Sequence, residues 1–178
     1  MKLQTTPFKD LIIISSKKNI DKRGSFREVY RQKELEDFLG YKVNFCQDNL
    51  VKSSYLVLRG LHYQSEPYSQ SKLVYVSKGK ILDIAVDMRK NSKTYGKYFS
   101  IILSEKENNA LFIPKGFAHG YLTLSEKVIV NYKVDNYYMK DYESGILFND
   151  INLDIDWGFK ENDLILSKKD KSFDSYKW

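Results

Sequence analysis

The chain has 178 residues, enough to bury most of its apolar surface within a single domain, and no apolar run long enough to cross a membrane. Its net charge is +6 and its pI is about 9.1, but the basic residues are scattered along the chain. A nucleic-acid binder typically clusters such residues in a stripe, so we expect neither a membrane nor a nucleic acid as partner.

The N-terminal residues and the cysteine content predict the cellular setting. The opening stretch contains only a short apolar run, residues 11–14, which is too short for a signal peptide. The single cysteine, Cys46, excludes an internal disulfide, which is the usual situation in a reducing compartment. We therefore expect a cytoplasmic protein.

One segment near the N-terminus has the pattern of a helix. Residues 31–40, RQKELEDFLG, place Leu35, Phe38 and Leu39 at helical spacing. Gly40 is the residue type that often ends a helix, so we expect the helix to stop there.

Most of the remaining chain alternates apolar and polar residues like half-buried strands, and the aromatic content of 15% also favours strands. Two strands are predicted around a turn at Lys78 and Gly79, in residues 72–88. Further strands are predicted at short intervals, in residues 97–104, 109–114, 120–125 and 126–134. Short strands at this spacing are typical of an antiparallel sandwich or barrel, and jelly rolls bind ligands in the barrel mouth.

Side-chain parity within two of these strands identifies unusual inward-facing residues. Successive side chains of a strand point to opposite faces, so Tyr132 shares a face with the valines of residues 126–134. Lys72 likewise shares a face with Val74 and Val76. A tyrosine is ordinary core material, but a lysine on an apolar face is costly unless it is paired or functional.

The two histidines, His62 in VLRGLHYQ and His119 in LFIPKGFAHGYLTL, both lie among apolar residues beside a glycine. A metal site, an acid–base pair and hydrogen-bonded core imidazoles are all compatible with this setting. The P-x-G-x-x-H spacing that ends at His119 resembles the second motif of the cupin superfamily of jelly-roll barrels. In metal-binding cupins the first motif is H-x-H, whereas here Gln64 follows His62 and Glu66 is the nearby acid. A site of two histidines and Glu66 stays open, but we expect no metal, because a catalytic transition metal usually has at least three protein ligands.

Several blocks in order resemble the dTDP-4-dehydrorhamnose 3,5-epimerase family. They are DKRGSFREVY, QDNLVKSS, VLRGLHYQ, QSKLVYV, GKILDIAVDMRKNSKTYGKY, LFIPKGFAHGYLTLSE, NYKVDNYYMKDYESGILFND, IDW and LSKKD. The resemblance implies a cupin-type double-stranded β-helix, with a few short peripheral helices, over residues 1–178 as a single domain. It also implies a homodimer in which N-terminal strands are exchanged with the partner.

The family resemblance implies an enzyme that inverts C3 and C5 of dTDP-4-keto-6-deoxy-D-glucose to give dTDP-4-dehydro-L-rhamnose. Both carbons lie beside the C4 ketone, so each can lose a proton to give an enolate without any cofactor. The substrate partner is then a dTDP-linked 4-keto-6-deoxyhexose. A C3-only or C5-only epimerase of another nucleotide-linked sugar is the nearest alternative. A non-catalytic sugar- or nucleotide-binding jelly roll and a metal-dependent cupin oxygenase or isomerase are the other classes to be tested.

Catalytic roles follow from the same resemblance. His62 matches the base of the family, and Asp170 matches the carboxylate that orients it. Locally, the Ser167-x-x-Asp170 spacing also resembles a helix capping box. Tyr132 matches the acid on the opposite face, and Lys72 matches the cation near the C4 oxygen. His119 matches a second histidine beside the sugar.

The charged residues that match substrate contacts lie in three separate blocks. Arg59 and Arg23 match residues at the sugar and phosphate end, where a guanidinium can bind a phosphate through two hydrogen bonds. Lys168 matches a nucleotide-contacting lysine, and Glu28 matches a substrate-contacting carboxylate.

Contacts to the nucleotide base are implied for a second group. Gln47 and Asn49 match polar contacts to the nucleotide, and Glu143 matches a thymine contact. Tyr138 stands where the family places an aromatic ring against the base, with Phe26 as a flanking residue.

The block QDNLVKSS departs from the family pattern. Val51 stands where many members have a small polar residue, and Leu50 beside it is also apolar. We therefore expect any alteration of the site at its nucleotide end and not among the catalytic residues.

Overall fold

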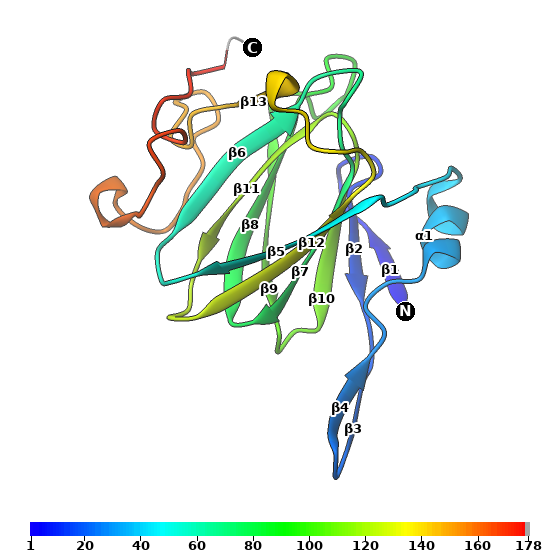
Figure 1. Ribbon diagram of the computed structural model, residues 1–178. Coiled ribbons are helices and arrows are strands. Elements are labelled where there is room, and N and C mark those ends of the chain that lie inside the picture. Colours follow the sequence, from blue (N-terminus) through cyan, green and yellow to red (C-terminus); the bar gives the residue numbers. More distant parts are fainter. Residues whose placement is uncertain (177–178) are drawn as a thin grey trace.

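The computed structural model describes residues 1–176, whose strands form two antiparallel sheets that face each other as a jelly-roll barrel (Figure 1). One sheet has six strands in the order β1-β2-β10-β7-β12-β5. These strands are β1 Lys2–Thr5, β2 Ile12–Ser15, β10 Asn109–Ile113, β7 Lys72–Lys78, β12 Val128–Val134 and β5 Gln47–Ser53. The other sheet has five strands in the order β13-β6-β11-β8-β9. These strands are β13 Glu143–Gly145, β6 Leu58–Gln64, β11 Phe117–Thr123, β8 Lys80–Asp87 and β9 Tyr98–Ser104.

Smaller elements lie outside the two sheets. They are the hairpin of β3 Lys18–Asp21 and β4 Gly24–Arg27, the helix α1 Gln32–Leu39, and the 3-10 turns η1 Lys140–Tyr142 and η2 Glu161–Asp163. The fold is the cupin-type jelly roll with short peripheral helices that the sequence predicts. Among the described residues, no helix is long and apolar enough to span a membrane.

The predicted helix forms with the expected end. Gly40 adopts a positive φ of 79°, and its N–H donates to the carbonyl of Glu36. Leu35 is fully buried, whereas Phe38 is 43% exposed, so only part of the predicted apolar stripe faces the protein. Leu35 packs with Ile12, Leu73 and other residues of the six-stranded sheet, and α1 therefore covers the outer face of that sheet.

Alternation along the strands divides each sheet between an inner and an outer face. The inner faces meet in a core that includes Val74 and Val76 of β7, Ala85 of β8 and Val130 of β12. Tyr132 packs against this core, so the inward parity predicted for it is confirmed. Residues of opposite parity face outward, so only the inward-facing side chains occupy the space between the two sheets.

The two strands predicted around Lys78 and Gly79 do form, but they do not pair with each other. β7 pairs with β10 and β12 in one sheet, whereas β8 pairs with β9 and β11 in the other. The turn is therefore a corner at which the chain passes from one sheet to the next. A two-residue turn between alternating segments is also typical of a hairpin, so the local pattern does not distinguish the two arrangements.

The chain after β13 covers the outer face of the five-stranded sheet, as the orange and red segment of Figure 1 shows. Trp157 and Phe148 from this segment pack against Leu58 and Leu61 of β6. The indole N–H of Trp157 donates to the carbonyl of Phe148 at 2.9 Å, so the buried ring keeps its polar atom paired. This segment also carries Asp170 back toward the cavity.

Candidate active site

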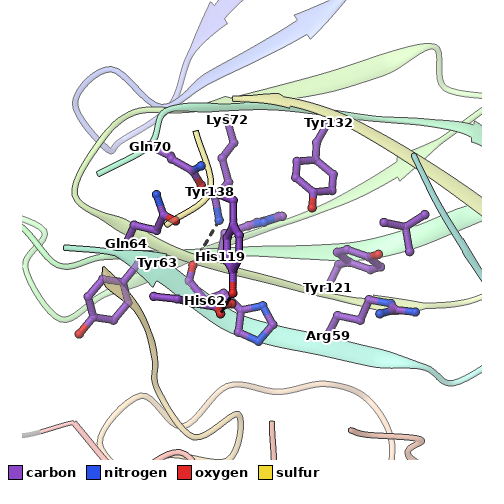
Figure 2. Close-up of a pocket in the computed structure, with 12 residues that line it drawn as sticks. Arg59, His62, Tyr63, Gln64, Gln70, Lys72, His119, Tyr121, Tyr132 and Tyr138 are labelled. Atoms are coloured by element: carbon purple, nitrogen blue, oxygen red, sulfur yellow. Dashed lines mark hydrogen bonds between the residues drawn. The ribbon is translucent and has the colours of Figure 1, made fainter. Parts of the chain in front are cut away.

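A polar cavity of about 220 Å³ opens between the two sheets. Both sheets supply its walls, and several of the labelled side chains in Figure 2 point into it. The lining residues are Val51, Arg59, His62, Tyr63, Gln64, Gln70, Lys72, His119, Tyr121, Tyr132, Tyr138 and Glu143. Seven of the predicted site residues are thus brought together here: Arg59, His62, Lys72, His119, Tyr132, Tyr138 and Glu143.

The two histidines are neighbours on paired strands, and each is hydrogen-bonded to a different carboxylate. His62 on β6 lies directly opposite His119 on β11. The Nε2 atom of His62 is 2.6 Å from Asp170 Oδ1, and the Nε2 atom of His119 is 2.7 Å from Asp83 Oδ1. The side chain of His62 is 31% exposed and that of His119 is 9% exposed. His62 is therefore the histidine with better access to a ligand.

Asp170 determines which nitrogen of His62 is available. Burial alone would raise the pKa of Asp170, but hydrogen bonds from His62 and Ser167 outweigh it and lower this pKa. The carboxylate is therefore ionised at neutral pH and accepts a hydrogen bond from the N–H at Nε2 of His62. The other nitrogen, Nδ1, then carries the lone pair that a proton acceptor needs.

The helix-capping interpretation of Asp170 is only partly realised. Its backbone N–H donates to Ser167 Oγ at 3.0 Å, as in the first half of a capping box. However, residues 167–172 form a turn and not a helix, and the carboxylate contacts His62.

A close packing contact holds the ring of His62 beside the C-terminal segment. Phe173 meets His62 edge to face, with ring centroids 5.6 Å apart. Gly145 of β13 lies opposite His62 in the sheet register. A Cβ atom at Gly145 would lie 2.5 Å from the ring of Phe173, so only glycine leaves room for this packing.

Lys72 is the buried cation of the cavity. It is 9% exposed, and its Nζ donates to the carbonyl of His62 at 3.3 Å. Burial lowers the pKa of Lys72 to about 8, although the negative charges of Asp83 and Glu143 partly oppose this by raising it. Most of the lysine is therefore protonated at pH 7, and an ammonium has further N–H donors to offer a ligand.

Tyr132 reaches the cavity from β12, in the sheet opposite that of His62 (Figure 2). Burial raises the pKa of Tyr132, and the nearby Arg59 only partly opposes this effect. The phenol is therefore a proton donor at neutral pH, facing the same space as the imidazole of His62.

On another side of the cavity, Glu143 contacts two neighbouring side chains. Tyr138 Oη donates to Glu143 Oε2 at 2.7 Å, and Lys169 forms an ion pair with the same carboxylate. The backbone N–H of Tyr138 donates to Gln47 Oε1 at 3.3 Å, and Gln47 donates to Asn49 at 2.9 Å. Gln47 and Asn49 thus lie beside the cavity wall without being among its lining residues.

Four of the residues predicted to contact the substrate lie away from the cavity of their own chain. Arg23 and Phe26 lie on the β3–β4 hairpin, which extends away from the barrel in Figure 1. Glu28 follows this hairpin and accepts a hydrogen bond from Arg31 at 2.7 Å. Lys168 is exposed on the C-terminal segment, two residues before Asp170.

The acid considered as a third metal ligand, Glu66, lies outside the cavity. Its carboxylate accepts a hydrogen bond from Ser69 at 2.6 Å. In residues 1–176, no group of three or more His, Cys, Asp or Glu side chains is arranged to hold a metal ion.

Sequence reasoning missed Asp83 and Tyr121, although a signal was present for each. Asp83 is an acid within the apolar strand residues 80–87, at the parity of Ala85, which is buried in the core. Tyr121 stands two residues after His119 on the same strand, and alternation places the two on one face. Extending the parity argument from Lys72 to these strands would have found both.

A jelly-roll barrel with histidine–carboxylate pairs and a buried lysine around an internal cavity defines a cupin-type protein equipped for proton transfer. The model of the dTDP-4-dehydrorhamnose 3,5-epimerase family matches residues 5–177. A protein of that name from Shigella flexneri is 45% identical over 170 residues, which cover 96% of this chain and 93% of the relative. The chain therefore belongs to the dTDP-4-dehydrorhamnose 3,5-epimerase family.

Solved structures of the same family are similar over nearly the whole chain. The crystal structure of dTDP-4-dehydrorhamnose 3,5-epimerase from Elizabethkingia anophelis NUHP1 matches with a TM-score of 0.94 and 45% identity, covering 99% of this chain and 96% of that one. The epimerase from Legionella pneumophila Philadelphia 1, in complex with dTDP-4-keto-L-rhamnose, matches with a TM-score of 0.92 and 41% identity, covering 98% and 92%. In the second structure a nucleotide-linked keto sugar is bound to this fold.

Proposed function

We propose that this protein converts dTDP-4-keto-6-deoxy-D-glucose to dTDP-4-dehydro-L-rhamnose by inverting C3 and C5. The observation that carries the proposal is the placement of His62 and Tyr132 on opposite sheets around one cavity, with Lys72 beside them. Inversion requires a proton acceptor on one face of the sugar and a proton donor on the other. This arrangement supplies both, within a family whose named members catalyse this reaction.

Each inversion is a proton exchange at a carbon next to the C4 ketone. Nδ1 of His62 takes the proton, and the electron pair of the broken C–H bond moves into the enolate. The O–H of Tyr132 then gives a proton to the other face of the same carbon, and exchange with solvent restores both residues. General acid–base catalysis of this kind contributes about 10²–10⁴-fold. The cycle transfers protons only, so it needs no redox cofactor.

Lys72 and Asp170 support these steps electrostatically. The ammonium of Lys72 stabilises the negative charge that develops on the C4 oxygen, and such preorganised donors contribute about 3 kcal/mol. Asp170 holds the imidazole of His62 in the tautomer that leaves Nδ1 free, and it stabilises the charged ring after proton transfer. His119, bonded to Asp83, lies beside the sugar as a binding residue.

The remaining predicted contacts are assigned to the nucleotide. We place the diphosphate at Arg59 and the base against Tyr138, whose hydroxyl is held by Glu143. Gln47, Asn49 and Lys168 flank the nucleotide. The nucleotide-linked substrate supports a cytoplasmic location.

Deuterium exchange tests the reaction directly. The protein is incubated in D₂O with dTDP-4-keto-6-deoxy-D-glucose, and the sugar is examined by NMR. Deuterium at both C3 and C5 is the expected result. Incorporation at one carbon alone would indicate a narrower epimerase, and incorporation at neither would eliminate the proposal. His62→Ala serves as the control, since a binding module would be indifferent to it.

We further propose a homodimer in which the β3–β4 hairpin completes the partner's site. The hairpin projects from the barrel (Figure 1), and its side chains Ile20 and Phe26 are 77% and 71% exposed. Arg23 on the same hairpin has a side chain that is 83% exposed. Apolar side chains so exposed on a projecting hairpin favour a protein partner.

Mixing two inactive variants tests this exchange. Arg23→Ala and His62→Asn are purified separately, then unfolded, mixed and refolded together. If the hairpin serves the partner, each mixed dimer regains one complete site, and about a quarter of the wild-type activity returns. No recovery, with dimers confirmed by light scattering, would show that Arg23 does not act across the interface.

A further inference from the structure

Tyr121 carries a buried hydroxyl that is poorly paired within the protein. The residue is 5% exposed, and its ring belongs to the core between the sheets. Within residues 1–176 its Oη atom makes no hydrogen bond of good geometry, and Ser53 is the only side chain that interacts weakly with it. Buried polar groups are nearly always paired, and an unpaired one is destabilising. A poorly paired hydroxyl on the wall of a ligand cavity therefore points to a group supplied by the ligand.

The surroundings of Tyr121 indicate what that group is. Tyr121 lies in the cavity wall (Figure 2), and the sheet register places it opposite Arg59 on β6. Arg59 is exposed, and its Nε donates to Ser53 Oγ at 3.3 Å, so most of the guanidinium donors remain for a ligand. Val51, which also lines the cavity, has no polar group to offer. A guanidinium beside a hydroxyl is a typical setting for a phosphate.

The protonation state of Tyr121 suits this role. Burial raises the pKa of Tyr121, and the charge of Arg59 and the weak interaction with Ser53 oppose the rise only in part. The hydroxyl is therefore an O–H donor throughout the neutral range and can donate to an anionic oxygen.

We propose that Tyr121 is a substrate-binding residue whose hydroxyl donates a hydrogen bond to a phosphate oxygen of the nucleoside diphosphate held by Arg59. The inference rests on the proposed function, because it takes a nucleoside diphosphate sugar as the ligand. It accounts for a buried hydroxyl that destabilises the free protein: its partner arrives with the substrate.

Tyr121→Phe tests the proposal, because it removes only the hydroxyl. The dissociation constant for dTDP and the KM for the dTDP-keto sugar are both expected to rise about tenfold, since the lost hydrogen bond is to a charged group. We expect kcat to stay within about twofold of wild type. The melting temperature of the ligand-free protein should be unchanged or higher, because a poorly paired buried group has been removed.

The outcomes separate this role from its alternatives. A rise in KM without a change in dTDP affinity would assign the hydroxyl to the sugar and overturn the phosphate contact. A lower melting temperature with unchanged dTDP affinity would make Tyr121 merely structural. Tyr75→Phe is the matched control, because Tyr75 lies on β7 at the parity opposite to Lys72 and outside the cavity lining. The dTDP measurement needs no turnover, so it tests Tyr121 even if wild type shows no deuterium exchange.

Discussion

Replacing Lys72 with methionine is expected to stabilise the fold while removing most of the activity. Burial lowers the pKa of this lysine from 10.5 to about 8, which corresponds to about 3 kcal/mol of unfavourable free energy for the charged form. Methionine is similar in length and suits an apolar environment. At pH 7 we therefore expect Lys72→Met to raise the free energy of unfolding by up to about 3 kcal/mol.

The same shift predicts how this gain depends on pH. Between pH 8 and 10.5 the unfolded chain still binds a proton at Lys72, whereas the folded protein has lost it. The stability of wild type, as far as Lys72 determines it, therefore rises with pH across this window. The advantage of Lys72→Met should be largest below pH 8 and should shrink toward pH 10.5.

Urea denaturation at several pH values, with kcat measured in parallel, tests this reasoning. Loss of the ammonium near the C4 oxygen should lower kcat by about 10²–10³-fold. Lys78→Met is the control, because this lysine is exposed at the other end of β7 and should affect neither property. A Lys72→Met protein that is less stable than wild type at pH 7 would refute the claim that the buried charge is destabilising.

Other substitutions test the histidine pairs and the packing around them. His62→Ala should lower kcat more than His119→Ala, and equal losses in steady-state assays would contradict the separate roles of base and binding residue. Asp170→Asn should lower kcat by about 10–150-fold, the value of a charge-assisted hydrogen bond, with little change in KM; an unchanged kcat would remove Asp170 from the mechanism. Gly145→Ala should displace Phe173 and reduce turnover, because a Cβ would lie 2.5 Å from its ring, while circular dichroism still reports a folded barrel. A fully active Gly145→Ala protein would mean that this packing is dispensable.

Period and parity were sufficient to predict an antiparallel sandwich or barrel and the inward direction of Tyr132, whereas the cupin type of the barrel was implied by the family resemblance. The same argument identified Lys72 as a buried cation, and in the structure Lys72 is buried and its pKa is lowered. The pairing partners of β7 and β8 were not predictable in this way, because they depend on which sheet each strand joins after the Lys78–Gly79 corner.

In the candidate site, too, features set by the local sequence were predictable, whereas features set by long-range contacts were not. The direction of an inward side chain is a local property of its strand. The pairing of His119 with Asp83 and of His62 with Asp170 depends on strands and segments brought together by folding. For Asp170 the local pattern favoured a cap, and only the family resemblance indicated its contact with His62.

The C-terminal contact with His62 has a consequence for the order of assembly. Asp170 stands 108 positions after His62, on a segment that packs over the outside of a barrel whose strands are already complete by Gly145. The cavity is therefore formed by one part of the chain, and the charge that orients its base is supplied by another. A molecule cleaved between β13 and Asp170 should lose much more of its turnover than of its affinity for the nucleotide sugar, because Lys168 is the only binding residue assigned to the cleaved segment. Catalytic turnover thus reports on the docking of the last segment far more sensitively than ligand binding does.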